Sequence, residues 1–410
     1  MSNISQNKIA IIGGGAAGFF AALSCKEHHP DAVVTIYERS DKLLAKVKVS
    51  GGGRCNVTHA CFNISQLSKF YPRGEKFLKK SFTQFNTNDT VKWFEDRGVK
   101  LKTEADNRMF PVTNNSQTII DCLMDEAKRK GVTIKLHSPV TAIEKQNDDF
   151  KIFFKEESIK ADKIIIANGG SPKIEGYQWL GKLGHTIVPP VPSLFTFNMP
   201  DNPITSLMGV AVNPVMVHVQ GTKLINEGPL LITHWGMSGP AVLKLSAWGA
   251  RHFHECHYQF QIQVNWLGAT TENEARERLA TEMELIKKRK ISNENIFRLP
   301  NRLWLFFLDK LEINPDTPWG DVSKKNMNRL LNTLLNDVYK VEGKTTFKEE
   351  FVTSGGVSLN DVSADTMESK VCKGMYLAGE VLDIDGVTGG FNFQAAWTTG
   401  FIAGKLSKNE

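Results

Sequence analysis

Four residues near the start of the chain have types and spacing suited to binding a nucleotide. Gly13, Gly15 and Gly18 form a GxGxxG pattern, and Glu38 follows about twenty residues later. Glycines at these places permit a tight turn and a close approach to a pyrophosphate, and an acid at this distance binds ribose hydroxyls. Because a carboxylate disfavours a 2′-phosphate, the pattern predicts the adenosine diphosphate of FAD or NAD rather than NADP. The alternative is an ordinary strand-to-helix turn.

These four residues require a strand, a turn and a helix in that order. Residues 9–12 are a short apolar run, residues 19–23 have a helix-like pattern, and residues 32–36 are a second β-branched run that ends just before the acid. The N-terminus of such a helix offers unpaired N–H groups to phosphates. We therefore expect Ala16 and Ala17, in its first turn, to contact the cofactor.

A second glycine cluster lies between Lys46 and Asn56. It contains Ser50, three successive glycines and Arg54. Such a loop can lie flat against a ligand and still offer hydrogen-bond donors. We interpret it as a contact with the pyrophosphate and the flavin edge, and the alternative is a flexible surface loop.

The end of the chain carries a further nucleotide-type pattern. Residues 374–380 read as a strand that ends in Gly379-Glu380, and residues 389–394 begin a final helix. The positive end of that helix, directed at N1 and the C2 carbonyl of a flavin, would stabilise the anionic reduced ring. A free-standing NAD domain has no need of this returning segment. The pattern therefore favours FAD and makes the first and last segments one split domain.

Composition limits the class of protein. The chain has 410 residues, of which 41% are hydrophobic and 23% charged, typical of a globular protein with two or three domains. No leader pattern and no membrane-length apolar run occur, so we expect a cytoplasmic protein without a membrane partner. The six cysteines form no CxxC pair, which argues against a disulfide framework. A net charge of +6 permits anionic ligands but does not indicate nucleic acid, and nothing indicates the oligomeric state.

Changes of pattern predict the domain organisation. Three prolines within residues 189–192 indicate a boundary, alternating apolar residues follow, and helical patterns begin near Glu272. The predicted domains are a first part of an FAD-binding domain (1–190), an insert (191–347, with 191–267 β-rich and 268–347 helical) and the second part of the FAD-binding domain (348–410).

Five ordered motifs together resemble one bacterial flavoprotein family. They are residues 50–56 (SGGGRCN), 108–111 (RMFP), 234–240 (HWGMSGP), 353–357 (TSGGV) and 378–392. The family contains the bile-acid-inducible reductase-like and aminoacetone oxidase-like proteins and many NAD(P)/FAD-dependent oxidoreductases. The resemblance implies an α/β fold: a glutathione-reductase-type FAD-binding Rossmann domain, split in sequence, with a mixed insert that is part β-barrel-like and part helical. His59 stands where this family leads us to expect an asparagine.

Local patterns and the resemblance together predict the cofactor contacts. Val140 is expected to meet the adenine through its backbone, and residues 167–169 end a buried strand beside the nucleotide. The complete predicted set is Gly13, Gly15, Ala16, Ala17, Gly18, Glu38, Arg39, Lys46, Ser50, Gly51, Gly52, Arg54, Cys55, Asn56, Val140, Ala167, Asn168, Gly169, Gly379, Glu380, Gly390, Asn392 and Phe393.

The residues for catalysis are less clearly indicated. Arg54 is the first candidate for an anion or electrophile contact near the flavin ring, and His234, beside a tryptophan, is the second, as a proton donor. Ser238 lacks the GxSxG spacing of a nucleophile elbow, so we interpret it as a helix cap before Pro240. Residues 252–256 would place two histidines and a cysteine on one face of a strand, but no further ligand completes a metal site, and we predict none.

The sequence therefore predicts an FAD-dependent oxidoreductase that transfers hydride between a small organic substrate and non-covalent FAD. NAD(P)H is the expected donor, bound transiently because no second complete GxGxxG pattern occurs. The alternatives are an oxygen-using amine oxidase of the aminoacetone type and a non-catalytic flavin-bearing sensor or RNA-associated module.

Overall fold

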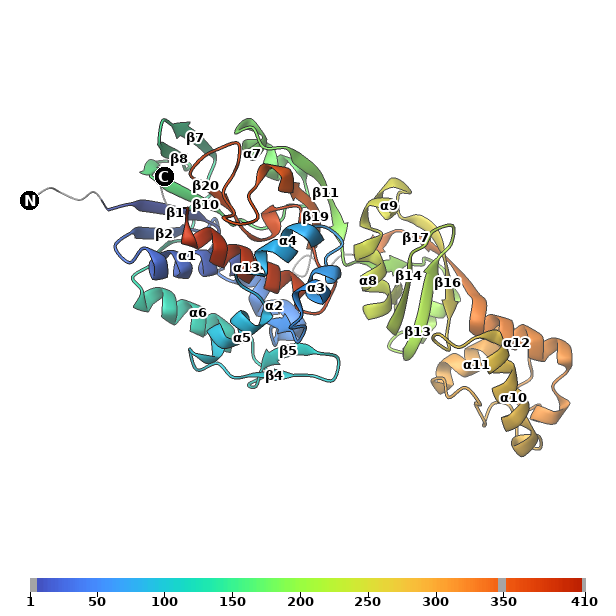
Figure 1. Ribbon diagram of the computed structural model, residues 1–410. Coiled ribbons are helices and arrows are strands. Elements are labelled where there is room, and N and C mark those ends of the chain that lie inside the picture. Colours follow the sequence, from blue (N-terminus) through green and yellow to red (C-terminus); the bar gives the residue numbers. More distant parts are fainter. Residues whose placement is uncertain (1–5, 346–351, 408–410) are drawn as a thin grey trace, which may run out of the picture. The chain divides into compact units, whose positions relative to one another are not determined.

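The computed structural model describes residues 6–345 and 352–407 (Figure 1). These residues form two compact units, 6–193 with 352–407 (unit 1) and 194–345 (unit 2). The first unit boundary follows strand β11 (Ile187–Ser193), so the expected boundary after residue 190 falls inside that strand. Its prolines are tolerated because β11 pairs only with β19 (Val352–Val357), with a register shift between Val188 and Val191. The expected boundary at residue 347 lies outside the described residues.

Unit 1 is built on a five-stranded parallel sheet with the strand order β20-β10-β1-β2-β6. Its strands are β1 (Lys8–Ile12), β2 (Val33–Tyr37), β6 (Thr133–Lys135), β10 (Lys163–Ile166) and β20 (Met375–Leu377). Residues 9–12 and 164–166 are buried without alternation, as expected of strands covered on both faces. Because all strands are parallel, their carboxyl ends meet at one edge of the sheet.

The first and last helices of unit 1 lie side by side. α1 (Ala16–His28) follows β1, and α13 (Phe391–Lys405) ends the described chain (Figure 1). A Cβ atom on Gly404 would lie 2.3 Å from the Ala21 carbonyl oxygen of α1, and one on Gly400 would lie 2.5 Å from that of Ala17. Only glycine permits this contact, which attaches the C-terminal segment to the N-terminal one.

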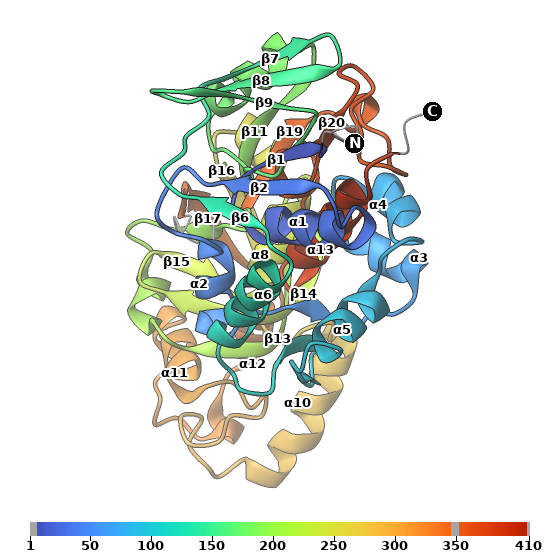
Figure 2. The ribbon, with the colours of Figure 1, turned by 90° about the vertical axis from the view of Figure 1, so that its left-hand side faces the viewer.

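Smaller elements complete unit 1. In Figure 2, α6 lies beside α1, and the small sheet β7-β8-β9 lies on the other side of β1 and β2. The remaining helices are α2 (Ala45–Gly53), α3 (Ile64–Leu67), α4 (Glu75–Ser81), α5 (Thr87–Glu95), α6 (Gln117–Arg129) and α7 (Gln178–Lys182). The short strands are β3 (Thr58–His59), β4 (Leu101–Thr103), β5 (Arg108–Pro111), β7 (Ala142–Gln146), β8 (Asp149–Phe153) and β9 (Ser158–Ala161).

Unit 2 contains a seven-stranded antiparallel sheet, ordered β17-β16-β13-β14-β15-β12-β18. Its strands are β12 (Thr196–Asn198), β13 (Ala211–Val219), β14 (Ile225–Thr233), β15 (Gly236–Ser238), β16 (Gln259–Asn265), β17 (Asp337–Glu342) and β18 (Lys344–Thr345). The first and last strands of this order follow one another in the chain. Gly343 between them donates to Tyr258 and accepts from Asn198, so the sheet curls until its ends meet. The β-barrel-like character predicted for the insert is confirmed.

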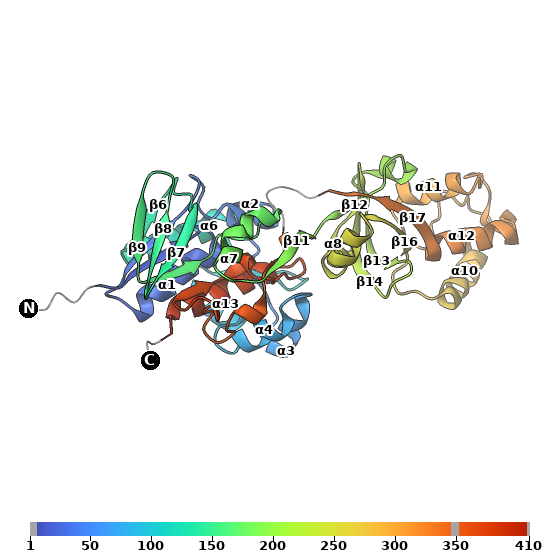
Figure 3. The same ribbon diagram turned by 90° about the horizontal axis from the view of Figure 1, so that it is seen from above.

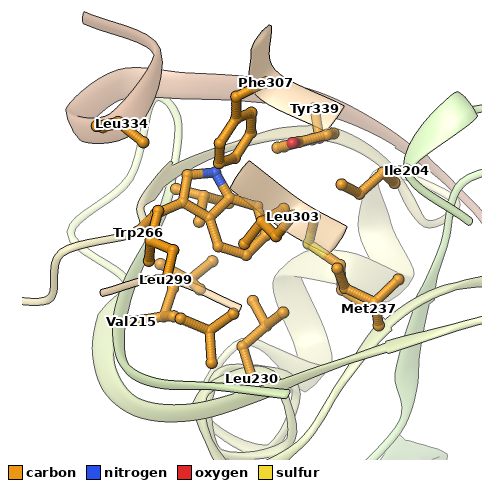
Figure 4. Close-up of a cluster of buried hydrophobic side chains, with 14 of the residues drawn as sticks. Ile204, Val215, Leu230, Met237, Trp266, Leu299, Leu303, Phe307, Leu334 and Tyr339 are labelled. Carbon is orange, nitrogen blue, oxygen red and sulfur yellow. The ribbon is translucent and has the colours of Figure 1, made fainter. Parts of the chain in front are cut away.

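Five α-helices belong to the described part of unit 2. They are α8 (Pro240–Trp248), α9 (Ala250–Glu255), α10 (Glu272–Ile286), α11 (Asn301–Lys310) and α12 (Lys324–Asn336), of which α10 to α12 group beyond the strands in Figure 3. The core they enclose centres on Trp266, which packs against Phe307 and Leu303 of α11 (Figure 4). Unit 2 therefore has a hydrophobic core of its own.

The interpretation of residues 268–347 as helical is wrong for their last part. Helix α12 ends at Asn336, and residues 337–342 form β17. Burial there alternates with period two, with Asp337, Tyr339 and Val341 buried. Lys310 and Tyr339 bind the Asp337 carboxylate, which allows an acid to begin a buried strand face.

No helix in residues 6–345 or 352–407 is both long enough and apolar enough to cross a membrane.

The contact between α1 and α13 predicts a substitution effect. Gly404→Ala should lower the free energy of unfolding by about 2 kcal/mol, because the new methyl group collides with the Ala21 carbonyl. Gly181→Ala in α7 is the matched control, since the nearest atom to its Cβ would be 3.9 Å away. Chemical denaturation of the holoprotein measures both. Equal stability of the two variants would contradict the assigned contact.

Candidate functional site

The N-terminus of α1 is shaped for close approach by a ligand. A Cβ on Gly13 would lie 2.4 Å from the Ala167 carbonyl, and one on Gly18 would lie 2.0 Å from the Gly13 carbonyl. A Cβ on Gly15 would meet no atom within 4 Å. Two glycines thus serve packing inside the protein, and Gly15 faces open space. It is the N-cap of α1, no side chain caps the helix there, and the first N–H groups remain available for an anion.

Glu38 lies against this turn. Its Oε2 accepts a hydrogen bond from Gly14 N–H (2.9 Å), and its Oε1 accepts from the backbone N–H (3.0 Å) and hydroxyl (2.8 Å) of Ser40. A carboxylate can accept about four hydrogen bonds, so capacity for about one more remains. Glu38 is therefore fixed in orientation beside the open face of Gly15. Arg39, the neighbouring predicted contact, is exposed.

Two further segments end at the same edge of the sheet. The segment after β6 is tied to the Glu38 region, because Ser138 N–H donates to the Glu38 carbonyl (2.8 Å), and half-buried Val140 follows it. Val140 lies in the link before β7 and not in a strand. At the end of β10, Ala167 is buried against Gly13, while Asn168 is exposed.

The loop of residues 50–56 includes the end of α2, where Ser50, Gly51 and Gly52 depart from helical geometry. Gly51, Gly52 and Gly53 all have left-handed φ angles (57°, 68° and 81°), and Cys55 N–H closes the loop onto the Ser50 carbonyl at 3.0 Å. A Cβ on Gly52 would meet nothing within 4 Å, which again indicates an open face. Cys55 is fully buried, and burial raises the pKa of its thiol to about 12. It stays protonated and has no role as a nucleophile.

Arg54 emerges from this loop and binds the β4–β5 hairpin. Its guanidinium lies 4.0 Å from the centre of the Phe110 ring, and its NH1 donates to Glu104 Oε1 at 2.6 Å. Its Nε donates to the Gly51 carbonyl at 3.3 Å. The side chain is about one third exposed (32%) and therefore accessible to a ligand.

Glu380 connects three elements beside the N-terminus of α1. Its Oε2 accepts from Lys46 Nζ of α2 at 2.5 Å, and its Oε1 accepts from Thr353 N–H of β19 at 2.8 Å. The preceding Gly379 packs against α1, because a Cβ there would lie 2.8 Å from that of Ala17. Lys46 and Glu380 were both predicted as cofactor contacts, and the structure brings them together.

Two predicted cofactor contacts have amides engaged within the protein. Asn392 accepts from Gly386 N–H (2.8 Å) and donates to the Gly386 carbonyl (2.9 Å). In the orientation that suits its neighbours, the Asn56 amide accepts from Gly390 N–H at 3.0 Å. These amides bond to the backbone of the segment that leads into α13. The two side chains therefore stabilise that segment within the protein. Phe393, also predicted, stacks on Trp397.

The other candidate residues, His234 and Ser238, lie in unit 2. His234 is exposed in unit 2, on the turn between β14 and β15, with its ring centre 3.7 Å from that of Trp235. Ser238 belongs to β15, and Gly239 takes the N-cap position of α8, so the predicted serine cap is wrong, although Pro240 does occupy the first turn.

The prediction that residues 252–256 belong to a strand, which would have grouped two histidines and a cysteine on one face, is also wrong. Residues 250–255 form helix α9, with Phe253 as their buried anchor. Within the described ranges, no three His, Cys, Asp or Glu side chains are grouped as metal ligands.

Sequence reasoning missed Ser40 and Glu104. Ser40 lies two residues after Glu38, and a serine so placed is a local signal for a turn that binds its carboxylate. Glu104 meets Arg54 only through the pairing of β4 with β5, so no local pattern could identify it.

These residues fit a flavin dinucleotide. The open face of Gly15, the uncapped N-termini of α1 and α13, and the fixed Glu38 carboxylate supply phosphate and ribose contacts of the kinds that FAD requires. The glycine loop and the Lys46–Glu380 pair lie in the same unit.

The chain was compared with known proteins. The family model described as "HI0933-like protein Rossmann domain" matches residues 7–406. A 3-dehydro-bile acid delta(4,6)-reductase of Clostridium scindens is 27% identical over 98% of this chain and 99% of that protein. A ribosomal RNA dihydrouridine synthase of Escherichia coli K12 is 29% identical over 95% of each chain.

Among solved structures, a 3-ketosteroid delta1-dehydrogenase from Sterolibacterium denitrificans, in complex with 1,4-androstadiene-3,17-dione, superposes with a TM-score of 0.51. It covers 97% of this chain and 99% of that one at 10% identity. At this identity the likeness concerns the fold alone. The predicted α/β Rossmann fold with its mixed insert is confirmed, and so is the predicted family.

The two roles of glycine at α1 predict different substitution effects. Gly15→Ala should leave the thermal stability of the apoprotein nearly unchanged and weaken FAD binding about tenfold or more, because its methyl group enters the open face. Gly18→Ala should lower apoprotein stability by its collision with the Gly13 carbonyl. Thermal unfolding and titration of the apoprotein with FAD measure both. A stable Gly15→Ala variant with normal FAD affinity would show that the open face is not the phosphate site.

Proposed function

The chain belongs to the HI0933-like family and is an FAD-dependent oxidoreductase, and from this premise we propose that it reduces a carbon–carbon double bond conjugated with a carbonyl group. NAD(P)H is the proposed donor. The balanced reaction consumes NAD(P)H, a proton and the unsaturated carbonyl compound, and it yields NAD(P)⁺ and the saturated one. FAD, when bound, supplies the two-electron transfer between donor and acceptor.

Two relatives' names support this reaction class. A delta(4,6)-reductase of a 3-dehydro-bile acid acts, by its name, on ring double bonds of a 3-oxo steroid. A dihydrouridine synthase saturates the C5–C6 bond of uracil, which is conjugated with the C4 carbonyl. The shared chemistry is a conjugated carbonyl. Because these relatives have similar identity to this chain and name different rings, we carry over the class of bond and not the ring.

Arg54 is the proposed electrophile. It is accessible, it belongs to the glycine loop, and its guanidinium lies 4.0 Å from the centre of the Phe110 ring. Placed at the substrate carbonyl, it would stabilise the negative charge that develops on oxygen when hydride reaches the conjugated carbon. The catalytic part of the proposal rests on the exposure of the Arg54 guanidinium at the glycine loop.

His234 is the proposed second group, as a proton donor. It is an exposed imidazole in the insert, and the return of a proton to the carbon next to the carbonyl completes the reduction. We propose that the insert, residues 191–347, shapes the substrate pocket and that residues 1–190 and 348–410 hold FAD.

The donor proposal predicts a transient-kinetic result. Anaerobic mixing of the holoenzyme with NADPH, and separately with NADH, should bleach the flavin absorbance with at least one donor. The reduced enzyme is then mixed with a 4-en-3-one steroid, cyclohexenone or uridine-containing ribosomal RNA. The compound that restores the absorbance of oxidised flavin identifies the ring that is reduced. Bleaching by amines with hydrogen peroxide release in air, and no bleaching by either nicotinamide, would instead indicate the amine oxidase. Salt-sensitive retention on RNA without turnover would indicate the binding module.

The role of Arg54 predicts a separation of the two half-reactions. Arg54→Gln should slow oxidation of the reduced flavin by the conjugated substrate about 100-fold and leave reduction by NAD(P)H within about twofold of wild type. Arg276→Gln on α10 is the control, because Arg276 forms an exposed ion pair with Glu272 in unit 2. Rapid-scanning absorbance measures each half-reaction. An equal loss in both would assign Arg54 to FAD binding.

A further inference from the structure

The pair formed by Arg54 and Glu104 is part of a compact four-charge cluster. Glu104 Oε1 accepts from Arg54 at 2.6 Å, and Glu104 Oε2 lies 3.5 Å from NH2 of Arg108. Arg108 in turn donates through Nε to Asp106 at 2.7 Å. The cluster, defined as Arg54, Glu104, Asp106 and Arg108, contains two positive and two negative charges and is neutral as a whole.

A rigid hairpin holds Glu104 in place. Glu104 N–H donates to the Arg108 carbonyl, and its own carbonyl accepts from Asn107 N–H, both at 2.9 Å. Phe110 on β5 is fully buried, and the Arg54 guanidinium packs on its ring. The turn between β4 and β5 thus fixes the backbone of Glu104, and its carboxylate is oriented by Arg54 and Arg108.

Compensation of charge changes what Arg54 can bind. An arginine without a partner attracts carboxylates and phosphates through its full charge. An arginine whose charge is balanced by a neighbouring acid loses most of its attraction for anions, and it still has N–H donors for the carbonyl oxygen of a neutral ligand. An anion that reached Arg54 would also meet Glu104 at close range, and like charges at such distances disfavour binding.

We propose that Glu104 is a positioning and specificity-determining residue: it orients Arg54 and cancels its charge, so that the site takes neutral conjugated carbonyl compounds and rejects conjugated carboxylates. This inference rests on the proposed function and narrows its substrate class. It includes ketones, amides and the uracil ring and excludes substrates whose reacting double bond carries a carboxylate.

The test uses crotonamide and crotonate, a neutral and an anionic conjugated carbonyl compound of nearly the same size. Each is titrated into oxidised holoenzyme, and dissociation constants come from the perturbation of the flavin absorbance, which needs no turnover. The wild type should bind crotonamide more tightly. Glu104→Gln, which keeps the shape and removes the charge, should bind crotonate about fivefold more tightly than wild type, the scale expected for a partly exposed ion pair.

Asp106→Asn is the matched control. It removes one negative charge from the same hairpin, but Asp106 contacts Arg108 rather than Arg54. Its crotonate affinity should stay within about twofold of wild type. Thermal unfolding of each variant confirms that it is folded.

Three results would overturn the proposal. They are an equal shift in Glu104→Gln and Asp106→Asn, an unchanged binding ratio in Glu104→Gln, and the absence of any spectral perturbation by either compound. A holoenzyme that NAD(P)H cannot reduce would defeat the proposed donor and leave this binding ratio measurable. The two failures are therefore distinguishable.

Discussion

Contact between backbones around the first turn of α1 is the constraint on which the rest of unit 1 depends. The carbonyl of Ala167 from β10 meets Gly13, the turn closes on Gly18, and Gly379 after β20 packs on Ala17. Three strand ends thus converge on one helical turn, where backbone meets backbone at Gly13 and Gly18 and the Gly379 backbone meets the methyl group of Ala17. This arrangement leaves the N–H groups of that turn facing outward, where a phosphate can reach them. The contact of α13 with α1 extends the same principle over two further turns.

Two carboxylates then fix the surroundings of this turn. Glu38 holds Gly14 and Ser40 together, and Glu380 holds Lys46 and Thr353. In each case a single acidic side chain joins backbone or side-chain donors from segments that are distant in the sequence. The same acids keep part of their hydrogen-bonding capacity for a ligand, so preorganisation of the site and binding of the cofactor use the same groups.

The parts of the fold that local chemistry determines could be predicted from the sequence. Strands β1, β2, β10 and β20 are apolar runs with a glycine or an acid within three residues of their ends, and this signal needs no knowledge of the tertiary structure. Strand β17 escaped prediction because it begins with Asp337, whose burial depends on Lys310 and Tyr339. From sequence alone, an acidic residue is expected at the surface. Its burial becomes understandable only when the residues that bind its carboxylate are known.

The same distinction applies to the site. Gly15 and Glu38 could be identified by spacing, because the turn and the following strand set their separation. The amides of Asn56 and Asn392 were expected on the cofactor, and the structure directs them to backbone groups of the turn that begins α13. Side-chain identity alone does not reveal which of two nearby acceptors an amide will choose. Backbone geometry therefore keeps Gly15 open to a ligand, whereas the choice of partner by the side chains engages these two amides within the protein.

This division also explains how one family can include proteins whose names specify different substrates. In the proposed site, the phosphate-binding turn depends on backbone contacts at Gly13 and Gly18, where any side chain would collide with a carbonyl oxygen, so this part of the site cannot change by small steps. Under the proposed function, recognition of the substrate depends on side chains such as Arg54 and on the insert, which has its own core around Trp266. The core of the insert is made by its own residues, so substitutions there leave the packing around α1 unchanged. A bile acid and ribosomal RNA can then be named in relatives of similar identity to this chain, 27% and 29%, and the proposed chemistry of the reduced bond accommodates both names.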